Sequence, residues 1–111
     1  MPIGQLIAVW LPIALGVVMI GAGVVNFVGP ASVRDSFARW GYPAGFHRVT
    51  GGLEATAGLL LLIPGTSRAG AIGSFVILLT AVMTLIRHRE WTHLPSAVVL
   101  TAVAVAVTIR G

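Results

Sequence analysis

The chain has 111 residues, of which 57% are hydrophobic and only 9% are charged, and it contains no cysteine. A soluble domain normally has about a quarter charged residues and under half apolar residues, so this composition excludes a soluble globular fold, a disordered chain and a coiled coil. The lack of cysteine excludes disulfides, zinc–thiolate sites and thiol catalysis within the chain. The seven arginines are scattered singly, so the net charge of +4 does not indicate a nucleic-acid-binding surface.

Four apolar segments are long enough to cross a membrane, since a bilayer core needs about 20 apolar residues, with a range of roughly 17–25. The segments lie at about residues 3–28, 45–63, 69–86 and 93–109. The first is long and lacks the basic start of a signal peptide, so we expect it to be a retained helix. The last alternates like a strand, but a lone strand leaves its backbone polar groups unsatisfied in lipid, so we expect a helix there too.

Short links join these segments, and short links predict antiparallel neighbours. In the first link, Val33, Phe37 and Trp40 are spaced as on one face of a helix, with charged residues between them. This pattern is typical of a short amphipathic helix on the membrane surface, and a plain polar loop is the alternative. The sequence therefore predicts an all-α membrane protein with a single domain over residues 1–111. Its fold is a four-transmembrane-helix antiparallel bundle with a short amphipathic segment between helices 1 and 2.

The arginines predict how the bundle is oriented. Five lie in or beside the first and third loops: Arg34, Arg39, Arg48, Arg87 and Arg89. On the opposite side there are two, Arg68 and Arg110. Because cytoplasmic loops carry the excess of basic residues, we expect a multi-pass protein of the cell membrane. Loops 1 and 3 would be cytoplasmic and both termini external.

Glu54 is an acidic residue inside an apolar segment, about nine positions or roughly 12 Å along the helix from its start. Small and polar residues share its face of the predicted helix: His47, Thr50, Gly51, Ala57 and Gly58, together with Leu61. A charged acid at the centre of a membrane helix costs at least about 2.5 kcal/mol, so we expect Glu54 to face the bundle interior. It is either a proton-carrying or substrate-binding acid, or a structural acid paired with an arginine or bonded to Thr50 or Asn26.

Glu54 and His47 are therefore the candidate catalytic residues, although His47 lies about 10 Å further along the axis, too far for a direct bond. The candidate ligand-binding residues are Thr50, Gly51, Gly58, Trp40, Tyr42 and Asn26. The alternatives are helix capping for the histidine, close helix packing for the glycines, interfacial anchoring for the aromatic residues and an interhelical hydrogen bond for the asparagine. No metal site is expected, because His88 and His93 lack a third ligand at a suitable spacing.

Several motifs follow one another between Gly21 and Arg87. They are WGYP at residues 40–43, then HRVTGGLEATAGLLLLIPGTSRAGA at residues 47–71, then an alanine and a leucine four positions apart at 81 and 85. The Gly-x-x-Glu, the Gly- and Leu-rich run and the proline in this order resemble the DoxX-like family of small four-helix membrane proteins. The resemblance implies small subunits of membrane redox complexes, including thiosulfate:quinone oxidoreductase, and hence a quinone as ligand, while the chain itself carries no cofactor ligand set.

Four functions stay open at this point. An accessory subunit that binds a quinone-like lipophilic ligand or a redox partner is favoured. A membrane-embedded enzyme of the isomerase or hydrolase type would use Glu54 as general acid or base, with His47 or Tyr42 assisting. An assembly factor would have no small ligand, and a proton-coupled small transporter is disfavoured because the first segment holds no acid. The expected partners are the lipid bilayer, a membrane redox protein and a second copy in a homodimer, with no nucleic acid.

Overall fold

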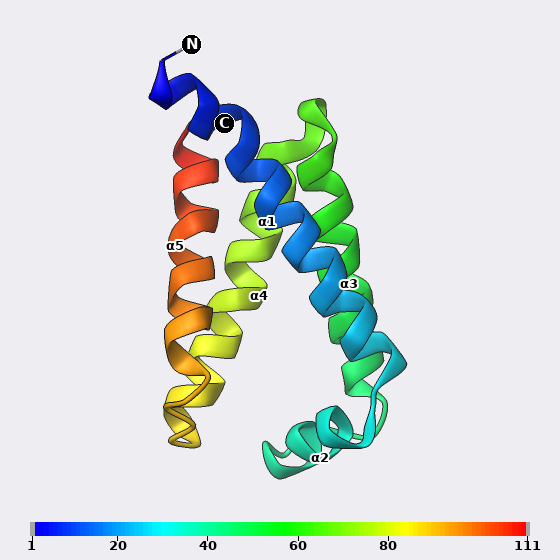
Figure 1. The fold of residues 1–111 in the computed structure, drawn as a ribbon. Coiled ribbons are helices and arrows are strands. Elements are labelled where there is room, and N and C mark those ends of the chain that lie inside the picture. The colour runs from blue at the N-terminus through cyan, green and yellow to red at the C-terminus, as the bar shows by residue number, and fades with distance from the viewer. Residues whose placement is uncertain (1, 111) are drawn as a thin grey trace.

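The computed structural model describes residues 2–110, and the described elements are all helical. They are α1 (Ile3–Val28), α2 (Ala31–Arg39), α3 (Phe46–Leu62), a short 3₁₀ helix (Pro64–Thr66), α4 (Ser67–Arg87) and α5 (Leu94–Arg110) (Figure 1). The long helices begin and end within two residues of the predicted segments. The first link forms a helix rather than a plain loop. Gly111 and the side chain of Arg110 lie outside the described part of the chain.

Two helical segments are long and apolar enough to cross a membrane, Ile3–Val28 and Pro64–Arg87. Only 22% and 28% of their most apolar windows are buried within the protein, whereas the core helix of a soluble protein would be mostly buried. Their outward-facing side chains are large and apolar, as Val17, Val24 and Met83 illustrate. Such surfaces match a lipid environment. The shorter helix α5 is also apolar, and the four-span bundle stays a prediction.

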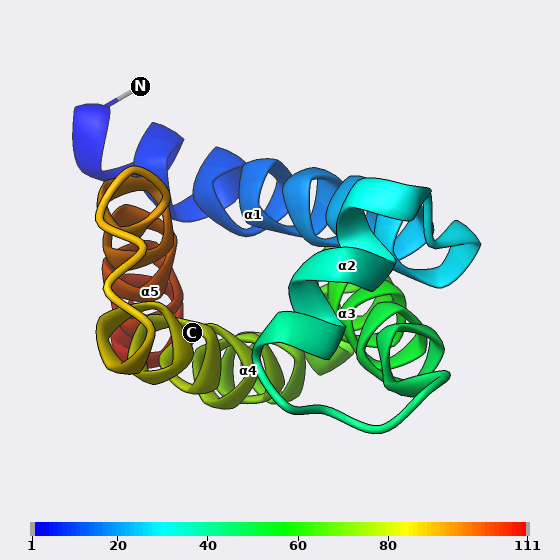
Figure 2. The same ribbon diagram turned by 90° about the horizontal axis from the view of Figure 1, so that it is seen from below.

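The four long helices form two antiparallel pairs, α1 with α3 and α4 with α5, and α3 also packs beside α4. The pairs lie close together where α3 turns into α4, and they diverge toward the other end of the molecule, where α2 lies (Figure 1). Seen along the bundle, the long helices surround a central space, and α2 lies across its end beside α3 (Figure 2). The long helices are therefore packed together at one end, and at the other end α2 lies beside α3 at the edge of the space between them.

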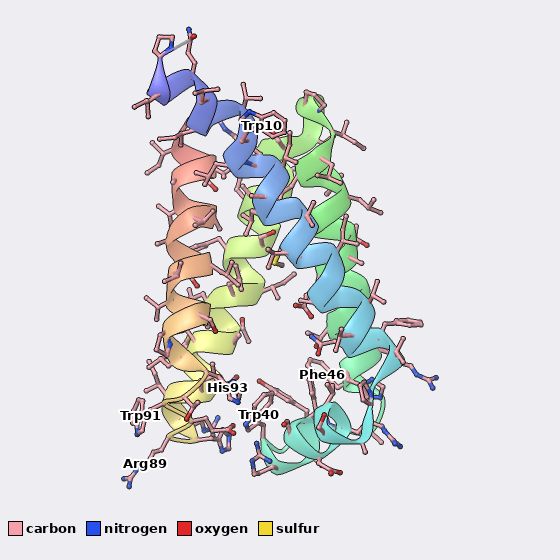
Figure 3. The ribbon with its side chains drawn as sticks, viewed as in Figure 1. Trp10, Trp40, Phe46, Arg89, Trp91 and His93 are labelled. Atoms are coloured by element: carbon pink, nitrogen blue, oxygen red, sulfur yellow. The ribbon has the colours of Figure 1, made fainter. Side chains whose placement is uncertain are left out.

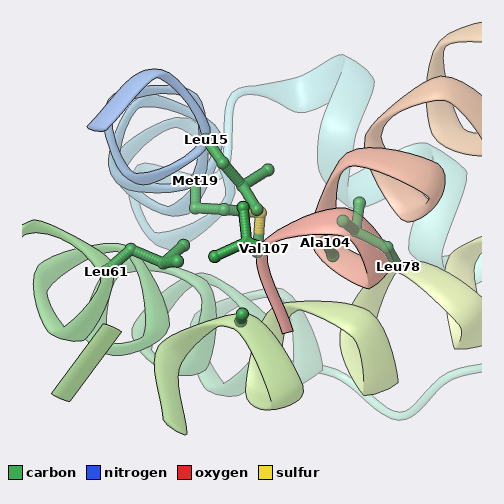
Figure 4. Packing of buried hydrophobic residues seen from close by; sticks show 7 residues of the cluster. Leu15, Met19, Leu61, Leu78, Ala104 and Val107 are labelled. Carbon is green, nitrogen blue, oxygen red and sulfur yellow. The ribbon is translucent and has the colours of Figure 1, made fainter. Parts of the chain in front are cut away.

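The hydrophobic core fills the end away from α2. Its buried members come from all four long helices: Leu15, Met19, Leu61, Ala71, Leu78, Ala104 and Val107 (Figure 4). Leu15, Ala71 and Ala104 have no exposed surface at all. This packed end holds the two helix pairs together, so the space between them at the α2 end need not be filled by side chains.

Glycines bring the backbones of α1 and α3 into direct contact. A Cβ added to Gly51 would lie 2.5 Å from the carbonyl oxygen of Gly23, and one added to Gly58 would lie 2.7 Å from that of Gly16. Real Cβ atoms do not approach backbone this closely, so only glycine fits. Small residues at such positions are typical of helix–helix contacts in membranes, because they let two backbones approach.

Candidate functional site

A cavity of about 760 Å³ lies between the two helix pairs at the α2 end. All five α-helices contribute to its wall, and most of the lining side chains are apolar, among them Val18, Leu53, Val76 and Leu100. A cavity of several hundred Å³ with apolar walls and a few polar groups is typical of small-molecule sites. We therefore take this cavity as the candidate site.

One polar pair lies within the apolar wall. Asn26, near the end of α1, donates a hydrogen bond from Nδ2 to Oε1 of Glu54 in the middle of α3, and both residues line the cavity. Glu54 is only 7% exposed. Its second carboxyl oxygen, Oε2, has no hydrogen-bond partner among the described residues. Of the three structural partners that the sequence left open for Glu54, the structure selects Asn26.

His47 also binds Asn26, but through the main chain. Its Nδ1 lies 2.8 Å from the carbonyl oxygen of Asn26, and because a carbonyl oxygen only accepts, Nδ1 is the donor. The ring packs against Gly29, which ends α1 in a left-handed conformation with φ of 67°. His47 is buried and is not among the residues that line the cavity. In this position it fastens the start of α3 to the end of α1.

The small and polar face predicted for α3 divides into two neighbouring faces. Gly51 and Gly58 lie against α1 and do not line the cavity. Phe46, Thr50 and Glu54 follow one another at intervals of four residues, and all three line it. Two side chains four positions apart lie one above the other on a helix, so these three form a continuous ridge along the cavity wall.

The other ligand-binding candidates, Trp40 and Tyr42, lie at the mouth of the cavity beside α2. Tyr42 and Thr84 on α4 have their hydroxyl oxygens 2.8 Å apart. Thr84 already donates to the carbonyl oxygen of Thr80, so Tyr42 is the donor.

Figure 3 shows Trp40 and Phe46 on the side of α2 and α3, and His93 across from them in the link before α5. The structure thus brings together Glu54, Asn26, Thr50, Trp40 and Tyr42 around one cavity.

A second acid, Glu90, lines the cavity beside Trp40. The indole N–H of Trp40 donates to Oε2 of Glu90, and an Nη of Arg39 lies 2.6 Å from Oε1. We call these two contacts the Glu90 latch. The hydrogen bond from Trp40, followed by the hydrogen bond and charge of Arg39, lowers the pKa of Glu90 below its usual value. The latch ties the end of α2 to the link between α4 and α5.

Aromatic rings surround this mouth. The ring of Phe37 has its centroid 5.5 Å from that of Trp40 and 5.7 Å from that of Tyr42, and Tyr42 stacks on Phe46 at 4.8 Å. Pairs at these separations stabilise a structure by about 0.5–1.5 kcal/mol each beyond the area they bury. Phe37, Trp40, Tyr42 and Phe46, which we call the aromatic cluster, all line the cavity.

Sequence reasoning did not single out Phe46 or Glu90 as site residues. Phe46 carries a signal that could have found it, because it lies two helical turns before Glu54 on the same face. Glu90 carries none, because its partner Trp40 is 50 positions away in the chain. Over the described residues, no three histidine or acidic side chains lie close enough together to hold a metal ion.

The fold and the cavity together define a class of protein: a small helical membrane protein with a ligand-sized internal cavity and an acid–amide pair inside it. Comparison with protein families makes the class specific. The model of the DoxX-like family matches residues 10–107, and the chain belongs to this family. Comparisons with curated proteins and with solved structures give no match. The matched range includes every residue of the candidate site, and the family together with the two apolar helices indicates a membrane protein.

Proposed function

We propose that this protein binds the head group of a lipophilic ligand in the cavity between its helix pairs, as a small accessory subunit in the membrane. The observation that carries the proposal is the Glu54–Asn26 pair inside an apolar cavity of about 760 Å³. A buried polar pair in an apolar wall gives a ligand both a surface to pack on and a point that fixes its orientation.

A quinone-like head group fits the residues present. Its ring has flat apolar faces, and its carbonyl oxygens accept hydrogen bonds. Asn26 keeps a second Nδ2 hydrogen after its bond to Glu54, and the hydroxyl of Thr50 lies one helical turn before Glu54 on the same wall. The aromatic cluster at the mouth offers rings on which a flat head group can stack. Asn26 and Thr50 would therefore donate to the ligand, and the rings would hold its faces.

Two features support a placement with four membrane spans, α1, α3, α4 and α5, and with the α2 end in the cytoplasm. Five arginines belong to that end, in α2, the first turn of α3, the last turn of α4 and the link after it: Arg34, Arg39, Arg48, Arg87 and Arg89. The amphipathic helix α2 would lie at the membrane surface there. In this placement a membrane redox protein would be the partner. One copy of the chain supplies all the lining residues of the cavity, so the proposal does not depend on a homodimer.

The enzyme alternative has weaker support. Glu54 and Tyr42 line the cavity as a general acid or base and its assistant would, but the hydroxyl of Tyr42 donates to Thr84. His47 donates to Asn26 and does not line the cavity. An assembly factor without a small ligand gives no reason for a polar pair inside an apolar cavity. Ligand binding is therefore the function that this geometry supports best.

Trp40 provides a reporter for the test. Quinones quench nearby indoles, so a variant with Trp10→Phe and Trp91→Phe would leave Trp40 alone at the cavity mouth. We expect decylubiquinone to quench its fluorescence saturably in nonionic detergent. Ala81→Phe, which fills the cavity from α4, should weaken binding by about tenfold or more, equivalent to at least about 1.4 kcal/mol. Ala69→Phe, an exposed site on the same helix, is the matched control. Quenching that does not saturate, or that both variants leave unchanged, would overturn the proposal.

A further inference from the structure

We infer that the charged ligands selected by this cavity are lipophilic organic cations, with Glu54 as their counter-ion. The inference rests on the proposed ligand-binding function, and it adds the sign of the charge that the site prefers. A protonated carboxyl group can hydrogen-bond a neutral ligand. After it loses the proton, the carboxylate can pair with a cationic ligand in the same place. The observations that carry this inference are the charges around the cavity, the free oxygen of Glu54 and the aromatic cluster.

The cavity lining contains two acidic side chains and none of the described arginines. Of the seven arginines, the six with described side chains all lie outside the lining, whose acids are Glu54 and Glu90 and whose histidine is His93. The charge of Glu90 is balanced by Arg39 at 2.6 Å, with Trp40 on its other oxygen. His93 lies in the link before α5, at the mouth. Within the described residues, Glu54 is thus the lining acid without a basic partner.

One carboxyl oxygen of Glu54 is available to a ligand in the cavity. Glu54 is only 7% exposed, and Asn26 donates a hydrogen bond to Oε1. Oε2 has no hydrogen-bond partner among the described residues. A buried carboxylate is strongly destabilised unless an opposite charge or hydrogen-bond donors compensate it. A positively charged ligand would supply that compensation. A negatively charged ligand would meet both the acid and an apolar wall.

The aromatic cluster at the mouth of the cavity also favours positively charged ligands. Ring faces attract cations, and organic cations such as quaternary ammonium groups are commonly recognised by several aromatic rings together. The ridge of Phe46, Thr50 and Glu54 leads from these rings to the acid. A ligand with a positive centre at Glu54 would place its apolar or aromatic body along Phe46 and Tyr42.

Tetraphenylphosphonium and tetraphenylborate test the inference, because they have nearly the same size and shape and opposite charge. Their binding to the purified protein in nonionic detergent can be measured by equilibrium dialysis against empty micelles. We expect one saturable site that binds the phosphonium at least about tenfold more tightly than the borate. The net charge of the protein, +4, would attract the borate anion. A preference for the phosphonium must therefore come from a group near the binding site.

Variants locate that group. Glu54→Gln should abolish the preference, whereas Asp35→Asn, an exposed acid on α2, should leave it unchanged. If Glu54→Gln does not fold, Glu54→Asp keeps the charge and should keep the preference. Equal binding of the two ions, tighter binding of the borate, or a preference that survives Glu54→Gln in a folded protein would overturn the inference. The decylubiquinone titration separates the two failures: if it still saturates, ligand binding stands and only the charge preference falls.

Discussion

Asn26 and Glu54 join α1 to α3 through a hydrogen bond inside the cavity, with Nδ2 of Asn26 donating to Oε1 of Glu54. The same asparagine accepts a hydrogen bond from His47 at its main-chain oxygen, 2.8 Å away. One residue of α1 therefore fixes two residues of α3 that lie two helical turns apart. Its side chain directs the acid toward the cavity, and its backbone anchors the start of the helix.

The contact between α1 and α3 predicts opposite effects for two adjacent glycines. Gly51→Ala would place a Cβ 2.5 Å from a backbone oxygen of Gly23, so we expect it to lower the free energy of unfolding by about 1–3 kcal/mol, as overpacking does. Gly52→Ala meets nothing within 4 Å and should raise it by about 0.5–1 kcal/mol, because alanine favours the helix. Denaturant titration in mixed micelles measures both. Equal effects of the two substitutions would contradict the packing of α1 on α3.

His47 should matter for stability and not for the ligand. His47→Ala removes a buried hydrogen bond to Asn26, and we expect it to lower the free energy of unfolding by about 1 kcal/mol. The affinity for decylubiquinone should stay within about twofold of the wild type, since the ring does not line the cavity. His88→Ala, in the link after α4, is the control for the loss of an imidazole. If His47→Ala instead weakened binding and left unfolding unchanged, His47 would belong to the binding site.

The Glu90 latch should open in acid. Because its partners lower the pKa of Glu90 in the folded protein, the latch contributes stability above the unfolded-state pKa of this group. It loses that stability as the pH falls through the lowered value. In the variant that keeps only Trp40, we expect acrylamide to reach the indole more readily as the pH falls. Glu90→Gln should show the more accessible indole already at neutral pH. An accessibility that stays constant through the acid titration would show that the latch does not hold α2.

The orientation can be tested with reporters. Because five arginines belong to the α2 end, the rule that positive residues stay inside predicts a cytoplasmic α2 and an external C-terminus. Alkaline phosphatase, which is active only outside the cytoplasm, should be active when fused after Gly111. It should be inactive when inserted in the link between α4 and α5. Activity in the reverse pattern would invert the orientation and leave the helices unchanged.

The fold could be predicted from the sequence to a large extent because the signals are local. The helices coincide with long apolar runs that end at charged residues or at Pro30, Pro43 and Pro64. Their observed ends lie within two residues of those that these signals predict. The lone acid in the apolar segments also predicted which face of α3 is buried: Glu54, Gly58 and Leu61 are buried, whereas Val49 and Leu59 are exposed.

The remaining features depend on contacts between distant residues. A helical projection shows that Gly51 and Glu54 share a face, but it does not tell which neighbour each one meets. One lies against α1 and the other faces the cavity. The contact between Trp40 and Glu90 joins residues 50 positions apart, and no periodicity within either segment indicates it.

Photolabelling can show whether a lipophilic ligand binds inside the cavity. A photoreactive azidoquinone, bound to the purified protein and mapped by mass spectrometry, should label the walls of the cavity. On α1 these are Val18, Met19, Ala22 and Asn26, and on α3 they are Phe46, Thr50, Leu53 and Glu54. An excess of decylubiquinone should suppress that labelling. Labelling spread over outward-facing residues such as Val17 and Leu59, with no suppression by decylubiquinone, would show that the ligand does not bind in the cavity.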